Sequence, residues 1–370
     1  MVDKMTKPPL TKAIVLKAMR DFFREKPFVF FGTGMSCALD PRFGMPALKD
    51  ELIKNVVLDP ASPEQERQWE LVLELLRNGS DLESALDNIN DSALLQEITR
   101  VTGRFVSSID REFALRIARG DVTWPATAFF KRLVDTLPEG DPILHVLTPN
   151  YDTLFEHACD SIGIPYTSGF VGGVERRIDW YSAQLSLLVP ERVRFGPRFK
   201  LNYRHRKHVR LYKVHGSLNL FFHRDSVVEN NAWMWDAPDF STRVIITPGL
   251  SKYQTLQRYR QELLKSADAA IDRAHHFLFL GYGFNDSHLE EYIRRKLVTQ
   301  GCNGLIITMD SNPRIDALLD EAENLWLVCK ANDGDVDGTR VFNKQYAGGL
   351  CLPARKLWDI GTFTTEILGG

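Results

Sequence analysis

The sequence has few cysteines and none at the spacing of a disulfide framework or a metal site. Its five cysteines are scattered, and no two form a C-x-x-C pair (Cys37, Cys159, Cys302, Cys329 and Cys351). Disulfide frameworks and cysteine-built zinc sites both need regularly spaced cysteines. We therefore expect a reducing compartment, no disulfide framework and no structural zinc or other bound metal.

Long apolar runs and a strong excess of one charge are also missing. No apolar run approaches the roughly 20 residues of a membrane span, and the N-terminal segment 1–7 is polar, unlike a signal peptide. The formal net charge is −2, so the overall charge gives no support to a nucleic-acid partner. These absences predict a cytoplasmic globular protein without a membrane partner.

The sequence does contain short apolar runs that alternate with segments of helical spacing. Runs at 28–31, 143–147, 277–280 and 305–309 are typical of buried strands, and 11–26 and 255–274 of helices. This alternation predicts an α/β fold with a Rossmann-like, mostly parallel, doubly wound sheet, in which 305–309 is the last clear strand. Helical spacing alone predicts a helical insertion over 47–135. Further short strands are expected at 209–214, 218–222 and 244–246, with the rest of 170–240 irregular.

Two of the expected strands run directly into glycine turns. Gly32-Thr33-Gly34-Met35-Ser36 follows the first, and Gly281-Tyr282-Gly283 follows the run at 277–280. Ligands of open α/β sheets bind beyond the carboxyl ends of the strands, where glycines let the backbone approach a pyrophosphate. A plain strand-to-helix turn explains either motif equally well on its own.

Polar residues that could take part in catalysis or binding follow other strands. Asn150 and Asp152 lie two residues apart after the run at 143–147, although Pro, Asn and Asp are also ordinary turn residues. His215 is the one histidine followed by Gly-Ser after a short apolar strand. An imidazole beside a flexible glycine suits acid–base catalysis, although a structural role is commoner for a single histidine. Asp310 ends the run at 305–309 and could accept ribose hydroxyls, or could be a cap or turn residue.

Taken together, the order and spacing of these motifs resemble the sirtuin (silent information regulator) family, over about residues 28–312. The details are closest to the sirtuin-like NAD hydrolases of bacterial anti-phage systems, of the kind paired with a HerA-type ATPase. Two segments are typical of this branch of the family, Thr148-Pro149-Asn150-Tyr151-Asp152 and Leu280–Leu289.

The resemblance implies a site for NAD. It places Gly32, Thr33, Gly34 and Ser36 around the diphosphate, Gly281 and Tyr282 on the adenosine side, and Asp310 at the adenine ribose. It places Asn150 beside the nicotinamide ribose and Asp152 where it recognises the nicotinamide amide. It makes His215 the catalytic histidine. A carboxylate at Asp310 would favour NAD over NADP. The implied activity is NAD glycohydrolysis, giving nicotinamide and ADP-ribose in anti-phage defence.

Two departures from the deacylating sirtuins bear on substrate. No cysteine lies between His215 and Cys302, whereas deacylases carry a zinc module with two C-x-x-C pairs. Their G-I-P-D-F-R motif is replaced by Gly44-Met45-Pro46-Ala47-Leu48-Lys49. Both departures weaken the alternative of an NAD-dependent protein deacylase. A second alternative, a non-catalytic NAD or ADP-ribose sensor, needs the same phosphate cradle and stays open.

Partners are suggested by one basic segment and by the domain arrangement. Residues 192–213 are rich in Arg and Lys with interleaved aromatics, so they could bind nucleic acid, although a solvated loop or a protein contact is favoured. We expect one sirtuin-like domain over 1–370, with 331–370 as a C-terminal extension. With no fused sensor, a homo-oligomer and a HerA-type ATPase partner are the expected regulators.

Overall fold

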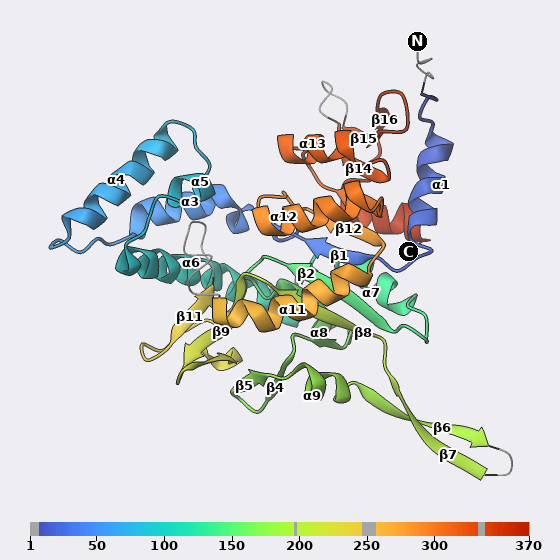
Figure 1. Ribbon diagram of the computed structural model, residues 1–370, viewed down its shortest axis with the longest axis horizontal. Helices are drawn as coiled ribbons and strands as arrows, with labels where there is room; N and C mark the ends of the chain where they lie inside the picture. The colour runs from blue at the N-terminus through green and yellow to red at the C-terminus, as the bar shows by residue number, and fades with distance from the viewer. Residues whose placement is uncertain (1–6, 196–197, 246–256, 332–336, 370) are drawn as a thin grey trace. The chain divides into compact units, whose positions relative to one another are not determined.

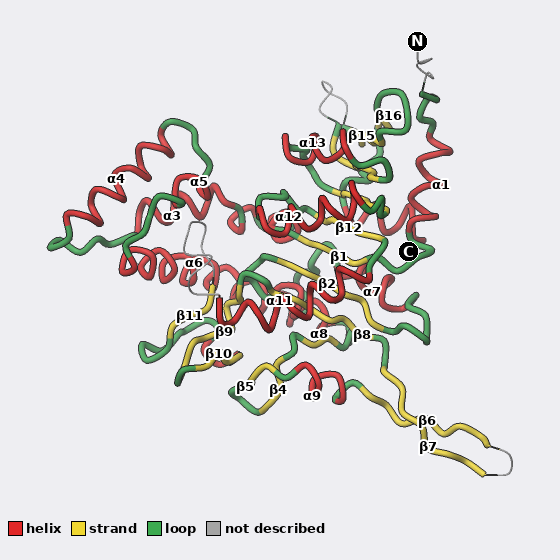
Figure 2. Tube along the Cα trace, in the orientation of Figure 1, coloured by secondary structure: helices red, strands yellow, loops and turns green. Residues whose placement is uncertain are grey.

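The computed structural model describes residues 7–195, 198–245, 257–331 and 337–369 (Figure 1). Contacts between Cα atoms divide the chain into two compact units. The first unit contains 1–38, 125–147 and 269–370, and the second contains 39–124 and 148–268. Figure 2 shows helices and strands in both units. None of the described helices is both long and apolar enough to cross a membrane.

The first unit is built on a mostly parallel sheet in the order β16-β15-β14-β13-β12-β1-β2. Neighbours from β2 to β14 pair in parallel, and β15 and β16 add antiparallel. The strands are β1 (Phe28–Phe31), β2 (Ile143–Thr148), β12 (His276–Leu280), β13 (Asn303–Ile307), β14 (Leu325–Lys330), β15 (Gly338–Asn343) and β16 (Leu350–Pro353). The expected α/β class with a mostly parallel sheet is therefore confirmed.

Helices cover this sheet because its central strands are apolar on both faces. All four residues of β1 are buried. Phe30 packs beside Phe279 of β12, with ring centroids 5.1 Å apart, while its neighbour Phe31 points to the other face and meets Phe130 of α7 (Thr127–Asp135). The other helices of the unit are α1 (Lys12–Phe22), α2 (Thr33–Cys37), α12 (Ser287–Arg294), α13 (Pro313–Glu321) and α14 (Ile360–Phe363), with π-helical turns at 295–299 and 364–369.

The order of the sheet creates a switch point at the end of β1. The chain passes from β1 to β2 on one side and later returns to β12 on the other side of β1. The connections that leave β1 and β12 therefore diverge, and ligands of open α/β sheets bind at such a point, beyond the carboxyl ends of the strands. The two glycine turns of the sequence lie here.

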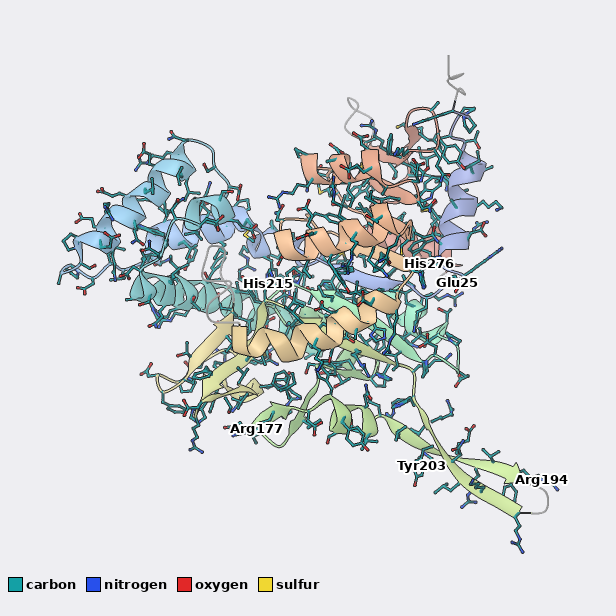
Figure 3. The ribbon with its side chains drawn as sticks, viewed as in Figure 1. Glu25, Arg177, Arg194, Tyr203, His215 and His276 are labelled. Atoms are coloured by element: carbon teal, nitrogen blue, oxygen red, sulfur yellow. The ribbon has the colours of Figure 1, made fainter. Side chains whose placement is uncertain are left out.

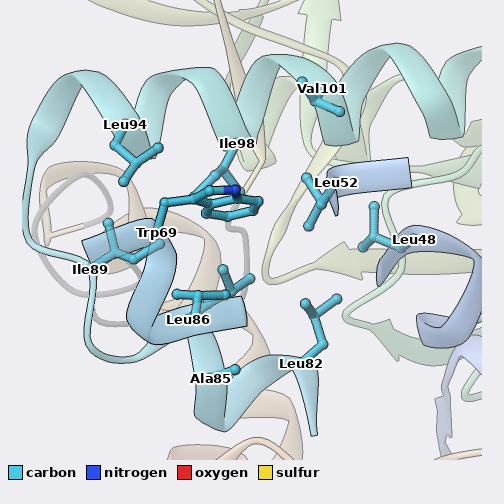
Figure 4. Close-up of a cluster of buried hydrophobic side chains, with 11 residues drawn as sticks. Leu48, Leu52, Trp69, Leu82, Ala85, Leu86, Ile89, Leu94, Ile98 and Val101 are labelled. Atoms are coloured by element: carbon cyan, nitrogen blue, oxygen red, sulfur yellow. The ribbon is translucent and has the colours of Figure 1, made fainter. Parts of the chain in front are cut away.

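In the second unit, residues 45–119 form a layer of helices with a core of its own. The helices are α3 (Met45–Asn55), α4 (Pro63–Arg77), α5 (Leu82–Leu86) and α6 (Ser92–Arg119), after a 3₁₀ turn at Pro41–Phe43. Leucines of α3 and α5 and Trp69 of α4 pack beneath Leu94, Ile98 and Val101 of α6 (Figure 4). Burying each such side chain stabilises the fold by about 1.5–3 kcal/mol. The helical character of 47–135 is thus as expected, although α7, at its end, belongs to the first unit.

The rest of the second unit is mainly strands. A sheet runs in the order β11-β9-β10-β5-β4, β3 pairs with β8 in parallel, and β6 pairs with β7 as a hairpin. The strands are β3 (Tyr166–Thr167), β4 (Phe170–Gly172), β5 (Arg176–Ile178), β6 (Leu188–Phe195), β7 (Arg198–His205), β8 (His208–Lys213), β9 (Gly216–His223), β10 (Ser226–Glu229) and β11 (Thr242–Ile245). The helices are α8 (Leu154–Ser161) and α9 (Trp180–Leu185), with a 3₁₀ turn at Asn231–Trp233; α11 (Gln257–Arg273) leads back to the first unit.

Two expectations about strands were wrong. The segment 305–309 is not the last strand, since β14, β15 and β16 follow it. The stretch 170–240 is not mostly irregular, since it contains β4, β5, the β6–β7 hairpin and β10. In β7, Phe199, Leu201 and Tyr203 alternate with polar residues, which is the period-2 signal of a strand. The expectation of an irregular segment did not use this signal.

Candidate functional site

The two glycine turns of the first unit lie against each other. The Gly32 amide donates to the Leu280 carbonyl at 3.0 Å, and the Gly34 amide donates to the Gly281 carbonyl at 3.1 Å. A Cβ on Gly32 would lie 2.6 Å from the Gly281 oxygen, and one on Gly34 would lie 2.8 Å from the Gly281 Cα. The turns can approach this closely only because all three residues lack side chains. Gly281 also has a φ of +51°, the left-handed region that favours glycine.

The residues around these glycines differ in exposure. Thr33 is half-buried, Gly34 is exposed, and Ser36 is fully buried in α2. Tyr282 is 3% exposed, and its ring packs against Phe30 and Phe284. The backbone amide of Gly34 already donates to the second turn. Gly34 contributes to the site by having no side chain, because this leaves room for the backbone of Gly281.

The loop after β12 is fixed by the start of α13. Asn312 Nδ2 donates to the Gly283 carbonyl at 3.0 Å, and Arg314 Nη1 donates to the Phe284 carbonyl at 3.0 Å. Asn312 Oδ1 also accepts the amides of Arg314 and Ile315 at 3.0 Å, so it is the N-cap of α13. The signal for this cap, an asparagine before Pro313, is present in the sequence.

Of the positions considered for it, Asp310 has that of a turn residue; it neither ends a strand nor caps a helix. Strand β13 ends at Ile307, and Asp310 lies in the exposed bend before Asn312. Its backbone oxygen accepts the Thr308 hydroxyl at 3.1 Å. An exposed carboxylate at the carboxyl end of β13, the neighbour of β12, has the chemistry to accept hydrogen bonds from a diol.

In the second unit, the segments that carry Asn150, Asp152 and His215 are joined by several hydrogen bonds. The Val214 amide donates to the Thr148 carbonyl at 3.2 Å, and the Leu218 amide donates to the Tyr151 carbonyl at 3.0 Å. Ser217 Oγ donates to the same Tyr151 oxygen at 3.4 Å. The segments 148–152 and 214–218 thus lie side by side.

The three residues of this pair of segments have different surroundings. Asn150 and Asp152 are each 6% exposed, whereas His215 is half-buried. The backbone amide of Asn150 donates to Thr148 Oγ1 at 3.1 Å, and Asp152 Oδ1 accepts the backbone amide of Leu154 at 3.3 Å at the start of α8. Figure 3 shows His215 just after β8. His215 is thus the most accessible of the three side chains, and the backbone at Asn150 and the Asp152 carboxylate are held by the turn.

A buried ion pair beneath the segment 148–152 was not predicted. Lys213 is 6% exposed, and its Nζ donates to the Asp152 carbonyl at 2.5 Å, to the Tyr151 carbonyl at 3.4 Å and to Glu156 Oε1 at 2.8 Å. A lysine is normally exposed, so its burial depends on this complete set of acceptors. Lys213 fixes the backbone that presents Asn150 and Asp152.

A second anchor comes from the long helix α6. Asp110 is fully buried and accepts the Thr153 amide at 2.6 Å, the Thr153 hydroxyl at 2.9 Å and Trp235 Nε1 at 3.0 Å. Arg243 donates to the carbonyls of Leu218 and Met234. Burial lowers the Arg243 pKa to about 10, against the opposing effect of the Asp110 charge. Nothing in the sequence around Asp110 marks it as a partner of Thr153.

The described part of the chain brings together no group of three His, Cys, Asp or Glu side chains that could hold a metal ion. The cysteines among these residues are all free thiols, three of them buried. That the protein contains no zinc stays a prediction.

Comparison with known protein families gives one match. Residues 144–327 match the SIR2-like domain. The matched range includes Asn150, Asp152 and His215, and also Gly281 and Asp310. It leaves out the first glycine turn at 32–36, which the fold brings against Gly281. The matched range therefore contains most of the site residues that the sequence predicted.

The solved structures to which this chain is similar include Sir2 proteins. A mutant Sir2 with a p53 peptide and NAD is 11% identical, with 95% of this chain and 97% of that chain covered and a TM-score of 0.41. A Sir2 homologue in complex with NAD is 12% identical, with 87% and 90% covered and a TM-score of 0.42. A structure on the mechanism and regulation of Sir2 enzymes is 12% identical, with 84% and 92% covered and a TM-score of 0.40. Among curated proteins, none matches this chain.

Proposed function

We propose that this protein hydrolyses NAD at the bond between nicotinamide and ribose, releasing nicotinamide and ADP-ribose. The observation that carries the proposal is the SIR2-like match over 144–327, within which the fold joins the segments of Asn150, Asp152 and His215 by hydrogen bonds. The paired glycine turns at a switch point support it, since dinucleotides bind at such places.

In the proposed site, the glycine turns hold the diphosphate. Gly32 and Gly34 let the backbone come close, with Thr33 and Ser36 at the start of α2. Gly281 and Tyr282 line the adenosine side, and the Asp310 carboxylate accepts the hydroxyls of the adenine ribose. A phosphate at the 2′ position would meet this negative charge, so NAD is the preferred substrate over NADP.

The proposed chemistry is a water-dependent glycoside cleavage. The bond from ribose C1′ to the nicotinamide nitrogen breaks, the electron pair leaves with nicotinamide, and the ribose passes through an oxocarbenium-like state. Water adds to C1′ and gives up one proton, which the His215 imidazole accepts and passes to solvent. Asn150 cannot titrate, so its amide orients the water or a ribose hydroxyl. Asp152 holds the nicotinamide amide.

Hydrolysis is favoured over deacylation by what replaces the deacylase motifs. At the position of the Asp-Phe-Arg part of that motif stands Ala47-Leu48-Lys49, and Leu48 is used in the helical core, where it is 5% exposed. No C-x-x-C pair is present in the sequence. Water then remains as the acceptor of the ADP-ribosyl group when the bond to nicotinamide breaks.

The biological part of the proposal rests on the resemblance to anti-phage NAD hydrolases. We infer an effector that depletes NAD during phage infection and that works with a HerA-type ring ATPase. A hydrolase that was always active would deplete the NAD of its own cell, so its activity must depend on assembly or on that partner.

The test is incubation of the purified protein with NAD, alone and with its ATPase partner, followed by chromatography of the products. Nicotinamide and ADP-ribose should form in equal amounts. His215→Ala should slow cleavage by roughly 10²–10⁴-fold, and Asn150→Ala should slow it without changing the shape of the pH profile. Both variants should still bind NAD in calorimetry. His223→Ala, in β9 of the same unit but outside the joined segments, should cleave at the parental rate.

Two outcomes would contradict the proposal. If His215→Ala cleaves NAD as fast as the parent, the assigned chemistry is wrong. If the protein binds NAD but releases no nicotinamide, with or without the partner, it is a sensor and not a hydrolase.

A further inference from the structure

The β6–β7 hairpin has two chemically different faces. Residues opposite each other in an antiparallel pair share a face, and the register pairs Arg192 with Leu201, Arg194 with Phe199 and Pro190 with Tyr203. One face therefore combines two arginines with a row of large apolar groups, and we call it the aromatic face. The other face has the Glu191–Arg204 ion pair at 3.7 Å, together with Arg198 and Lys200. It also has the smaller apolar residues Val189 and Val193.

The aromatic face is open to solvent. Phe199 is 71% exposed, Leu201 53% and Tyr203 59%. The hairpin extends away from α9 and β8 as a separate ribbon (Figure 1), and Figure 3 shows the side chains of Tyr203 and Arg194 on it. A two-stranded hairpin alone is marginally stable in water. A row of exposed aromatic and aliphatic groups flanked by arginines has the composition of the centre of a protein interface.

The charge of the hairpin limits what can cover this face. It has five basic residues and one acidic residue, whereas the whole chain has a net charge of −2. Antiparallel pairing of two hairpins along β7 would gather Arg198, Lys200 and Arg204 of both copies along one seam, and like charges at opposite positions are destabilising. Along β6, Pro190 interrupts the outer edge. An acidic surface with an apolar centre complements both the charge of the hairpin and its exposed apolar row.

The same chain has such a surface on α4. Glu66, Glu70 and Glu74 follow one another at four-residue spacing, so they lie on one face of the helix, and all three are exposed. Glu70 and Glu74 line a groove of about 500 Å³ together with Leu71, which is 41% exposed. We call it the α4 groove.

Two of the three carboxylates that line this groove, Glu70 and Glu74, are not balanced by their own helix; the third, Glu64, pairs with Arg67, which also lines the groove. Arg67 donates to both oxygens of Glu64, at 2.6 and 2.8 Å. Among the described residues, neither Glu70 nor Glu74 has an ion-pair partner within 4.0 Å. Like charges four residues apart on a helix repel, so a cation that covered this row would relieve the repulsion.

We propose that the aromatic face of the hairpin of one copy docks in the α4 groove of a second copy. Arg192 and Arg194 meet Glu70 and Glu74, and the exposed apolar row covers Leu71. Each copy offers one hairpin and one groove, so the contact is head-to-tail, and it closes into a ring or continues as a filament. The proposal is independent of the hydrolase activity, because neither surface includes a residue of the proposed NAD site.

The test measures the mass of the full-length protein in solution by light scattering, over a range of protein and salt concentrations. The parent should associate beyond a dimer, and less so at high salt. R192E/R194E and E70K/E74K should each weaken association at least about tenfold. R198E/K200E, with the same charge change on the other face of the hairpin, should weaken it much less.

Mixing the two charge-reversed proteins gives the decisive result. The acidic hairpin of R192E/R194E should fit the basic groove of E70K/E74K, and the reverse pair should fit as well, so an equimolar mixture should regain the mass of the parent. Misfolding of either variant cannot produce this rescue. The proposal is overturned if the parent is monomeric throughout, if only the hairpin variant dissociates, or if the mixture does not associate. A parent that stays monomeric but binds a labelled single-stranded oligonucleotide through the hairpin would assign that face to nucleic acid instead.

Discussion

Replacement of Gly281 by alanine tests whether the two glycine turns need to be in contact. The new Cβ would lie 2.9 Å from three backbone atoms, the Cα and carbonyl carbon of Gly34 and the nitrogen of Met35. Backbone atoms cannot rotate away, so the turns must separate, at a cost of about 1–3 kcal/mol. The left-handed φ of +51° adds about 1–2 kcal/mol. We expect Gly281→Ala to lower the free energy of unfolding by about 2–5 kcal/mol.

Gly301→Ala is the matched control. Gly301 also has a left-handed φ, +65°, and belongs to the same unit, but the nearest atom to its added Cβ is Asn324 Nδ2 at 4.0 Å. Only the conformational cost of about 1–2 kcal/mol applies there. Urea unfolding followed by circular dichroism gives both values, and NAD calorimetry should show weakened binding for Gly281→Ala only. Equal losses of stability for the two variants would refute the claim that the turns are tightly packed.

Three further predictions concern charge. Initial rates should be higher with NAD than with NADP, and Asp310→Asn should narrow that difference; equal rates for the parent would remove Asp310 from the ribose site. Lys213→Met leaves Glu156 buried without its cation, which should cost about 3–5 kcal/mol of stability, and Lys213→Met/Glu156→Gln should recover part of it in thermal melts. Burial lowers the pKa of His208 from 6.5 to about 4, so the unfolded chain takes up this proton before the folded one does. Stability should therefore be complete above pH 6.5 and fall as the pH drops toward 4, by up to about 3 kcal/mol; His208→Gln should flatten that fall in urea titrations, and an unchanged slope would contradict the assignment.

The sequence was sufficient for the strands that carry the glycine turns. Strands β1, β12 and β13 are buried on both faces, so they appear as unbroken apolar runs with glycine or polar residues at their ends. This pattern depends only on local chemistry. It located the two turns, but it could not show that they touch, because the contact between Gly34 and Gly281 depends on the strand order.

Other parts of the site depend on partners that are distant along the chain. Lys213 appears in the sequence as one more basic residue, and its burial is explained only by the Tyr151, Asp152 and Glu156 oxygens around it. Asp110 lies within a long helix and reaches Thr153, 43 positions away. Local periodicity contains no information about either contact.

The position of β12 late in the chain has a consequence for synthesis. Strand β1 emerges early from the ribosome, but its parallel neighbour β12 and the Gly281 turn follow only after the whole second unit has been made. A nascent or prematurely terminated chain that lacks β12 cannot assemble the contact between Gly32 and Gly281. If this contact is needed to hold NAD, chains that end before β12 cannot bind it at this site.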